Sequence, residues 1–142
     1  MHNGEFTNDK LHKYPHMFPL DIAIWERFLD QFGADYLGFD YDIKVGSGTE
    51  PVPGLTEEYQ RMQAILSKYR VDVVGYTNNA IYIIETKPEA GTTAIGQIDL
   101  YVSLYKRDFN PDRQVKGMII TDRELPDVRW HCQEKGIEIV VV

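Results

Sequence analysis

Two apolar segments joined by Asn78-Asn79 constrain the fold more than any other part of this 142-residue chain. Residues 71–77 and 80–87 are rich in β-branched and aromatic side chains, which favour strands. Asparagine tolerates the positive φ angles of tight turns, so the asparagine pair predicts a β-hairpin. Pro88 ends the second strand, because proline cannot donate a hydrogen bond to a neighbouring strand.

The segments around this hairpin alternate between helical and strand patterns. Apolar spacing of three or four residues predicts helices, and period-two alternation predicts strands. We expect helices over 19–32, 56–69, 93–107 and 126–135, and further strands over 36–45, 115–121 and 137–142. Within 36–45 the side chains are expected to alternate between two faces of the sheet. The order predicts an α/β (α+β) protein with one mixed sheet flanked by helices.

The length suits one domain. Residues 1–18 are polar and contain three histidines whose spacing fits no tight metal-ligand pattern, so a loosely ordered N-terminal arm is expected there. Residues 19–142 are expected to form a single domain. Cys132 is the only cysteine, which excludes an internal disulfide framework and multi-cysteine metal sites. No apolar run is long enough to span a membrane, so we expect a cytoplasmic protein without a membrane partner.

The charge balance is acidic, with a formal net charge of −7, and both halves of the chain share this sign. A protein that binds the phosphate backbone of nucleic acids usually carries the opposite charge. A nucleic-acid ligand would therefore need a local basic patch, or metal ions that offset the negative field.

Charged side chains interrupt both strands of the predicted hairpin. Asp72 is the only charged residue of an otherwise apolar strand, and Glu85 and Lys87 share one face of its partner. Such groups are costly to bury unless they pair with each other or with an ion. The two carboxylates and the carbonyl of Thr86 would form an oxygen site suited to Mg²⁺, and Lys87 could position a water beside it.

The helix after the hairpin adds Gln97 and Tyr101, one turn apart on a single face. Asp72, then Glu85-Thr86-Lys87, then Gln97-x-x-x-Tyr101 resembles the PD-(D/E)XK nuclease superfamily, and the Gln-x-x-x-Tyr step resembles its RecB-like branch. The stretch 70–108 is also similar to small nuclease-like proteins of bacteriophages. The proline expected before the aspartate is Val71 in this chain.

The resemblance implies a restriction-endonuclease-like αβββαβ core, with the helix at 56–69 as an insertion and a C-terminal αβ extension. It implies that Asp72 and Glu85 bind Mg²⁺ or Mn²⁺, that Lys87 assists the attacking water, and that Gln97 and Tyr101 complete the site. The family often adds a glutamate from the first helix, and Glu26 is the candidate here, with Glu58 a weaker one.

Other interpretations of these residues stay open at the level of sequence. Asp72, Glu85 and Lys87 could form a structural ion cluster, and Glu26 could be a stripe-edge residue paired with a cation. The residues Asp40, Asp42 and Lys44 form a rival metal-site candidate, although their alternation is more typical of a solvated face.

Candidate nucleic-acid contacts are Arg70, which shares the face of Asp72, and the pair Lys106 and Arg107. With Arg113 and Lys116, this pair is the nearest feature to a basic patch, although cations are also favoured at the end of any helix.

Together these features predict an Mg²⁺-dependent nuclease that hydrolyses DNA, with a protein partner or homo-oligomer delivering the substrate. Nothing in the sequence separates DNA from RNA, or endonuclease from exonuclease action. The alternative is a catalytically silent nuclease-fold module that serves as a phage accessory or virion component, located in the host cytoplasm or the virion.

Overall fold

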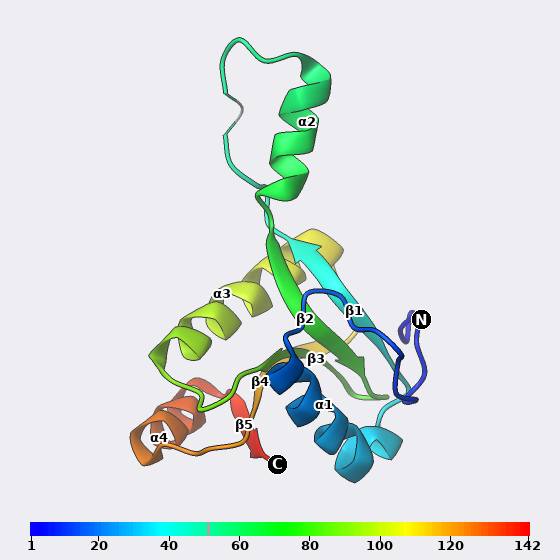
Figure 1. Ribbon diagram of the computed structural model, residues 1–142, viewed down its shortest axis with the longest axis vertical. Helices are drawn as coiled ribbons and strands as arrows, with labels where there is room; N and C mark the ends of the chain where they lie inside the picture. Colours follow the sequence, from blue (N-terminus) through cyan, green and yellow to red (C-terminus); the bar gives the residue numbers. More distant parts are fainter. Residues whose placement is uncertain (51) are drawn as a thin grey trace.

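A computed structural model describes residues 1–50 and 52–142 and arranges them around one mixed sheet (Figure 1). The elements in chain order are α1 (Pro19–Phe32), the 3-10 helix η1 (Gly33–Asp35), β1 (Gly38–Val45), α2 (Glu57–Leu66), β2 (Tyr69–Tyr76), β3 (Ala80–Thr86), α3 (Thr92–Phe109), β4 (Gln114–Thr121), α4 (Pro126–Lys135) and β5 (Glu138–Val141). The predicted helices, strands and mixed sheet are confirmed, with small shifts at their ends.

The strands lie in the sheet in the order in which they occur in the chain. β1, β2 and β3 are antiparallel neighbours, whereas β3, β4 and β5 run parallel to one another. Parallel neighbours need a crossover connection, and α3 and α4 supply the two crossovers. Because such crossovers share one handedness, both helices pack on the same face of the sheet.

A hydrophobic core lies on each face of the sheet. On one face, α3 and α4 contribute Ala94, Ile98, Tyr101, Tyr105, Val128 and Cys132. On the other, α1 contributes Ile24, Trp25, Phe28 and Leu29. The sheet is therefore a middle layer between helices, and α1 and α3 approach it from opposite sides (Figure 1).

The strict alternation predicted for residues 36–45 is wrong at Asp42. Phe39 and Tyr41 pack in the α1 core, whereas Val45, which has the same parity, packs in the α3 core. Asp42 has a φ of +56°, a left-handed conformation that is foreign to regular strands. This residue therefore reverses which side chains of β1 face α3.

The same interruption separates the members of the rival metal-site candidate. Asp40 is buried and accepts hydrogen bonds from the Tyr76 hydroxyl (2.7 Å) and the Glu5 amide (2.8 Å). Asp42 instead forms an ion pair with Arg70. The two aspartates have different partners, and the solvated face expected here is wrong for Asp40.

Residues 1–18, expected to be a loosely ordered arm, form no helix, but they lie against the sheet. Phe6 forms a bridge with Phe39 of β1, and Tyr14 and Met17 are buried in the α1 core. A Cβ on Gly38 would lie 2.3 Å from the carbonyl oxygen of Asn3, so glycine permits this close approach.

Helix α2 belongs to a projecting segment, described at residues 46–50 and 52–68, that stands away from the sheet at the end of the β1–β2 ribbon (Figure 1). None of its described helical residues is buried. None of the described helices has the length and apolar character needed to cross a membrane.

Candidate metal-dependent active site

The candidate site lies where β2 and β3 separate. Their pairing ends at Val73 and Ile84, although β3 continues alongside β4 as far as Thr86. Beyond that point, side chains replace the missing strand partners: the Asp72 amide donates to Glu85 Oε1, and the Thr86 amide donates to Asp72 Oδ2, both at 3.3 Å. The two carboxylates predicted from the sequence are thus brought together by the backbone itself.

Burial and mutual repulsion perturb both carboxyl groups. Glu85 is 3% exposed, and burial together with the charge of Asp72 raises its pKa to about 9. Burial also raises the pKa of Asp72 above its usual range. Two adjacent buried carboxylates cannot both ionise cheaply without a compensating cation. At neutral pH the pair therefore holds a proton unless a cation displaces it.

Lys87 supplies a positive charge that acts on both carboxyl groups. It follows Glu85 by two residues, just beyond the end of β3, and its charge lowers the pKa values of both Asp72 and Glu85. Its amide donates to the Ile120 carbonyl (2.9 Å), which fixes the backbone of Lys87 to β4 beyond the end of β3. Burial, the larger effect, outweighs this attraction for both carboxyl groups.

Helix α3 presents two further predicted residues to the site. Tyr101 is 7% exposed, and burial with the negative charges of Glu85 and Asp72 raises its pKa to about 12, so its hydroxyl remains a donor. Gln97 Oε1 is buried, and among the described residues it has no hydrogen-bond partner. A buried amide oxygen without a donor is unusual, and it is available to a group that enters the site.

The donor set fits a hard divalent cation. Asp72 and Glu85 provide buried carboxylate oxygens with raised pKa values, and Gln97, one helical turn before Tyr101 on α3, has an unsatisfied acceptor. Within the described ranges, no three His, Cys, Asp or Glu side chains gather into a metal-binding group. Mg²⁺ needs only one or two protein carboxylates, because it retains several of its waters. A site of two carboxylates is therefore sufficient for Mg²⁺ but poor for zinc.

In the structure, Glu26 contacts the N-terminal segment and is not among the charges that act on Asp72 or Glu85. Its carboxylate accepts a hydrogen bond from the Tyr14 hydroxyl (3.4 Å), and its charge acts on Lys10 and Tyr41. From α1, the charge that acts on Asp72 is that of Asp21, which also accepts a hydrogen bond from the Phe18 amide at the helix start.

Sequence reasoning missed Asp21 because an acidic residue in a first helical turn is adequately explained as a cap. No signal in the sequence marked it for the site, because its carboxylate has a local role at the start of α1. Glu58, the weaker candidate, lies on the exposed helix α2.

The three predicted nucleic-acid contacts differ in their surroundings. Arg70 lies two residues from Asp72, but it is paired with Asp42: its Nη2 donates to Asp42 Oδ2 (3.3 Å), and its Nε is 3.1 Å from Asp42 Oδ1. Arg107 is paired with Asp108 at 2.8 Å. Lys106 lines a polar cavity of about 440 Å³ between α3, β4 and the start of β5, and this cavity also contains Lys116, Lys135, Asp99 and Glu138.

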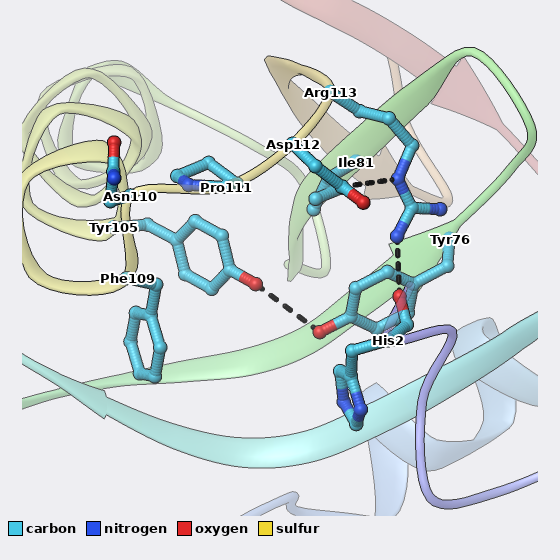
Figure 2. Close-up of a pocket in the computed structure, with 9 residues that line it drawn as sticks. All are labelled: His2, Tyr76, Ile81, Tyr105, Phe109, Asn110, Pro111, Asp112 and Arg113. Atoms are coloured by element: carbon cyan, nitrogen blue, oxygen red, sulfur yellow. Dashed lines mark hydrogen bonds and ion pairs between the residues drawn. The ribbon is translucent and has the colours of Figure 1, made fainter.

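The sequence grouped Arg113 with the basic patch, but in the structure its side chain is buried and hydrogen-bonds to other parts of the chain. Its side chain is 4% exposed, and it donates to Asn3 Oδ1 and to the carbonyl oxygens of Thr77 and His2. Figure 2 shows it beside Tyr76 in a pocket of about 330 Å³ where the hydroxyls of Tyr76 and Tyr105 are 3.2 Å apart. This pocket lies at the turn end of the hairpin, opposite to Asp72 and Glu85.

Comparisons with known proteins define the class of fold. No family model matches the sequence, and a search of curated proteins finds no similar sequence. Among solved structures, a repair endonuclease from Pyrococcus abyssi matches with a TM-score of 0.53 and 16% identity, over 94% of this chain and 49% of that one. A protein of unknown function, AF1548, matches with a TM-score of 0.51 and 14% identity, over 82% of this chain and 53% of that one.

The chain thus has a restriction-endonuclease-like α+β fold, as its sequence predicts. It spans about half the length of each of these two proteins. At this level of identity the similarity concerns the fold alone, and the chemistry must be argued from the residues of the site.

Proposed function

We propose that this protein is a metal-dependent nuclease that hydrolyses phosphodiester bonds of DNA. The observation that carries the proposal is the pair of buried carboxylates, Asp72 and Glu85, held together by backbone amides where β2 and β3 separate. Two adjacent buried carboxyl groups with raised pKa values are costly to ionise without a cation, and a bound divalent cation would offset that cost. The similarity of the fold to that of a repair endonuclease supports the same interpretation.

In this proposal, Asp72, Glu85 and the carbonyl of Thr86 hold Mg²⁺ or Mn²⁺. The bound cation would supply Lewis-acid stabilisation of the negative charge that develops on the phosphate oxygens. Lys87 orients the attacking water by hydrogen bonding and balances the negative charge of the carboxylates. Gln97 Oε1 accepts a hydrogen bond from that water or from the Lys87 ammonium group, and the protonated Tyr101 hydroxyl donates to a phosphate oxygen.

DNA binding is the step of the proposed reaction that the charge of this chain supports least. The chain carries a net charge of −7, which opposes the approach of a polyanion. Besides Lys87, the positively charged group near the carboxylates in sequence is Arg70, which is already paired with Asp42. Three further lysines, Lys106, Lys116 and Lys135, line the polar cavity beside α3 and the start of β4. Low intrinsic affinity is therefore expected, and a protein partner or a second copy of the chain would deliver the DNA.

The decisive experiment compares the wild-type protein with Lys87→Ala on supercoiled plasmid and single-stranded DNA, with Mg²⁺ or Mn²⁺. Loss of the lysine is expected to reduce cleavage by at least about a hundredfold, a typical contribution of a positioned proton-transfer or electrostatic group. Lys13→Ala, an exposed lysine on the N-terminal segment, is the matched control.

Equal cleavage by both variants would assign the activity to a contaminant and contradict the proposal. Absence of cleavage by every variant, with no Mg²⁺ or Mn²⁺ binding by calorimetry, would favour the second candidate, a catalytically silent nuclease-fold module. The observation that favours this candidate is the acidic charge of the chain. RNA oligonucleotides in the same assay decide between the two nucleic acids.

A further inference from the structure

Helix α2 packs its polar side against its own chain and turns its apolar side to solvent. Gln60 and Gln63 hydrogen-bond to the backbone of Val52 in the preceding loop (both 3.4 Å). Ser67 Oγ accepts from the Thr49 amide (2.7 Å). This arrangement reverses the usual one, in which an amphipathic helix buries its apolar face in its own domain.

The outward side carries a continuous apolar stripe. Its members follow a spacing of four, three and four residues, and each is 43% to 74% exposed: Leu55, Tyr59, Met62 and Leu66. Tyr69, the next residue in this spacing, belongs to β2 and packs against Tyr101 of α3. Ile65, 49% exposed, lies beside them. A shallow hollow of about 570 Å³ runs along this stripe. An isolated helix of ten residues is marginal in water, and a large exposed apolar patch marks an interaction surface.

The charged residues of this segment favour an antiparallel arrangement of two copies. Glu58 lies near the start of α2 and Lys68 two residues beyond its end, five residues to either side of residue 63. If two copies of this segment pair antiparallel with residue 63 at the crossing point, Glu58 of each lies level with Lys68 of the other. A parallel pairing would not bring these opposite charges level with each other.

We propose that two copies of this chain associate through their α2 helices, packed antiparallel along the apolar stripe. The projecting helix is the part of the surface best suited to contact between two acidic molecules. Residues 46–68 contain three acidic and two basic side chains, so this segment carries a charge of only −1 in a chain of net charge −7. It also stands clear of the rest of the domain, so a second copy reaches it without a clash between sheets (Figure 1).

The self-association is independent of the proposed chemistry and is tested without DNA. The wild-type protein is expected to form a concentration-dependent dimer in sedimentation-velocity runs across the micromolar range. Met62→Glu and Leu66→Glu place a charge in the stripe, and each is expected to raise the dimer dissociation constant at least about tenfold. Trp130→Glu is the matched control, because Trp130 is 62% exposed but lies on α4. Circular dichroism confirms that each variant is folded.

Charge exchange distinguishes a second copy from any other partner. Glu58→Lys alone and Lys68→Glu alone each place like charges together in the antiparallel dimer, so both are expected to weaken it. The double variant restores opposite charges and is expected to recover the wild-type dissociation constant. A partner of different sequence would not be restored by the double exchange.

A wild-type protein that is monomeric throughout the micromolar range overturns the proposal. A dimer that is insensitive to Met62→Glu and Leu66→Glu also overturns it, as does a dimer that the double charge exchange fails to restore. These outcomes are separate from the cleavage assay, so failure of the dimer and failure of the nuclease proposal are distinguished.

Discussion

At the scale of residues, Asp72 and Glu85 serve both the backbone and the candidate chemistry. Each accepts a hydrogen bond from an amide that has lost its strand partner, and each is a candidate metal ligand. The acceptor function needs only an oxygen atom, whereas metal binding needs the negative charge. Amide isosteres therefore separate the two functions.

Glu85→Gln is expected to stabilise the metal-free protein at alkaline pH. The folded-state pKa of Glu85 is raised from 4.5 to about 9, so between these values the folded state binds more protons than the unfolded state. Stability consequently falls as pH rises through this window, and glutamine removes that loss. We expect a gain of at least about 1 kcal/mol at pH 9 and little change at pH 5, because one pKa unit corresponds to about 1.4 kcal/mol.

Urea denaturation in EDTA at several pH values measures this difference. The control is Glu134→Gln on the exposed surface of α4, which should leave the pH dependence unchanged. An unchanged pH profile for Glu85→Gln would mean that the carboxyl group is not buried beside Asp72 in solution.

Much of the candidate site could be predicted from residue spacing. Asp72, Glu85 and Lys87 stand out because charges interrupt apolar strands, and Gln97 and Tyr101 because they lie one helical turn apart. Asp21 of α1, whose charge acts on Asp72, could not be predicted from residue spacing. The face of a helix that meets a distant strand depends on tertiary packing, and Asp21 has a sufficient local explanation as a cap.

At the scale of elements, Gly117 sets the distance between α3 and the sheet. A Cβ on Gly117 would lie 2.3 Å from Cγ2 of Ile98, a fully buried branched side chain of α3. Gly117→Ala is expected to push α3 outward and to destabilise the protein by about 1 to 3 kcal/mol through overpacking. Because Gln97 and Tyr101 lie on the same helix, cleavage should fall as well.

Gly96→Ala provides the matched comparison within α3. No atom lies within 4 Å of a Cβ at this position, and alanine favours a helix interior over glycine. This variant is expected to gain about 0.5 to 1 kcal/mol in thermal or urea unfolding. A destabilised Gly96→Ala, or a neutral Gly117→Ala, would contradict the packing described for α3.

The strand patterns were predicted better than the irregularity within them. Apolar strand patterns and the Asn78-Asn79 turn located the five described strands, but not the left-handed backbone of Asp42 that turns the end of β1 toward α3. Aspartate is one of the few residues that adopt this conformation, yet it does so at a minority of its positions. The pattern of residue types therefore does not mark which aspartate interrupts a strand.

At the scale of the whole molecule, cation binding is expected to stabilise the fold. A ligand that binds only the folded state raises the free energy of unfolding by about 2.7 kcal/mol when its free concentration is about 100 times its Kd. Mg²⁺ or Mn²⁺ should therefore raise the melting temperature of the wild-type protein by several degrees at pH 8.

The double variant Asp72→Asn, Glu85→Gln should lose this response to the metal while remaining folded. Differential scanning fluorimetry with a metal titration measures it, and Ca²⁺ in place of Mg²⁺ tests binding without turnover. A shift of equal size in the double variant would locate the cation elsewhere on this acidic surface.

The substitution of side chains for strand partners between β2 and β3 bears on how such a protein evolves. If a descendant lost its substrate, mutation at Asp72 would still leave the Thr86 amide without an acceptor, and mutation at Glu85 would do the same to the Asp72 amide. Purifying selection on folding alone would then preserve both acidic positions, or their amide counterparts, long after turnover had ceased. Lys87, which has no such structural duty toward the divergent strands, would be free to drift. Among descendants, substitution of Lys87 while both acidic residues are retained would therefore indicate that the activity has been lost.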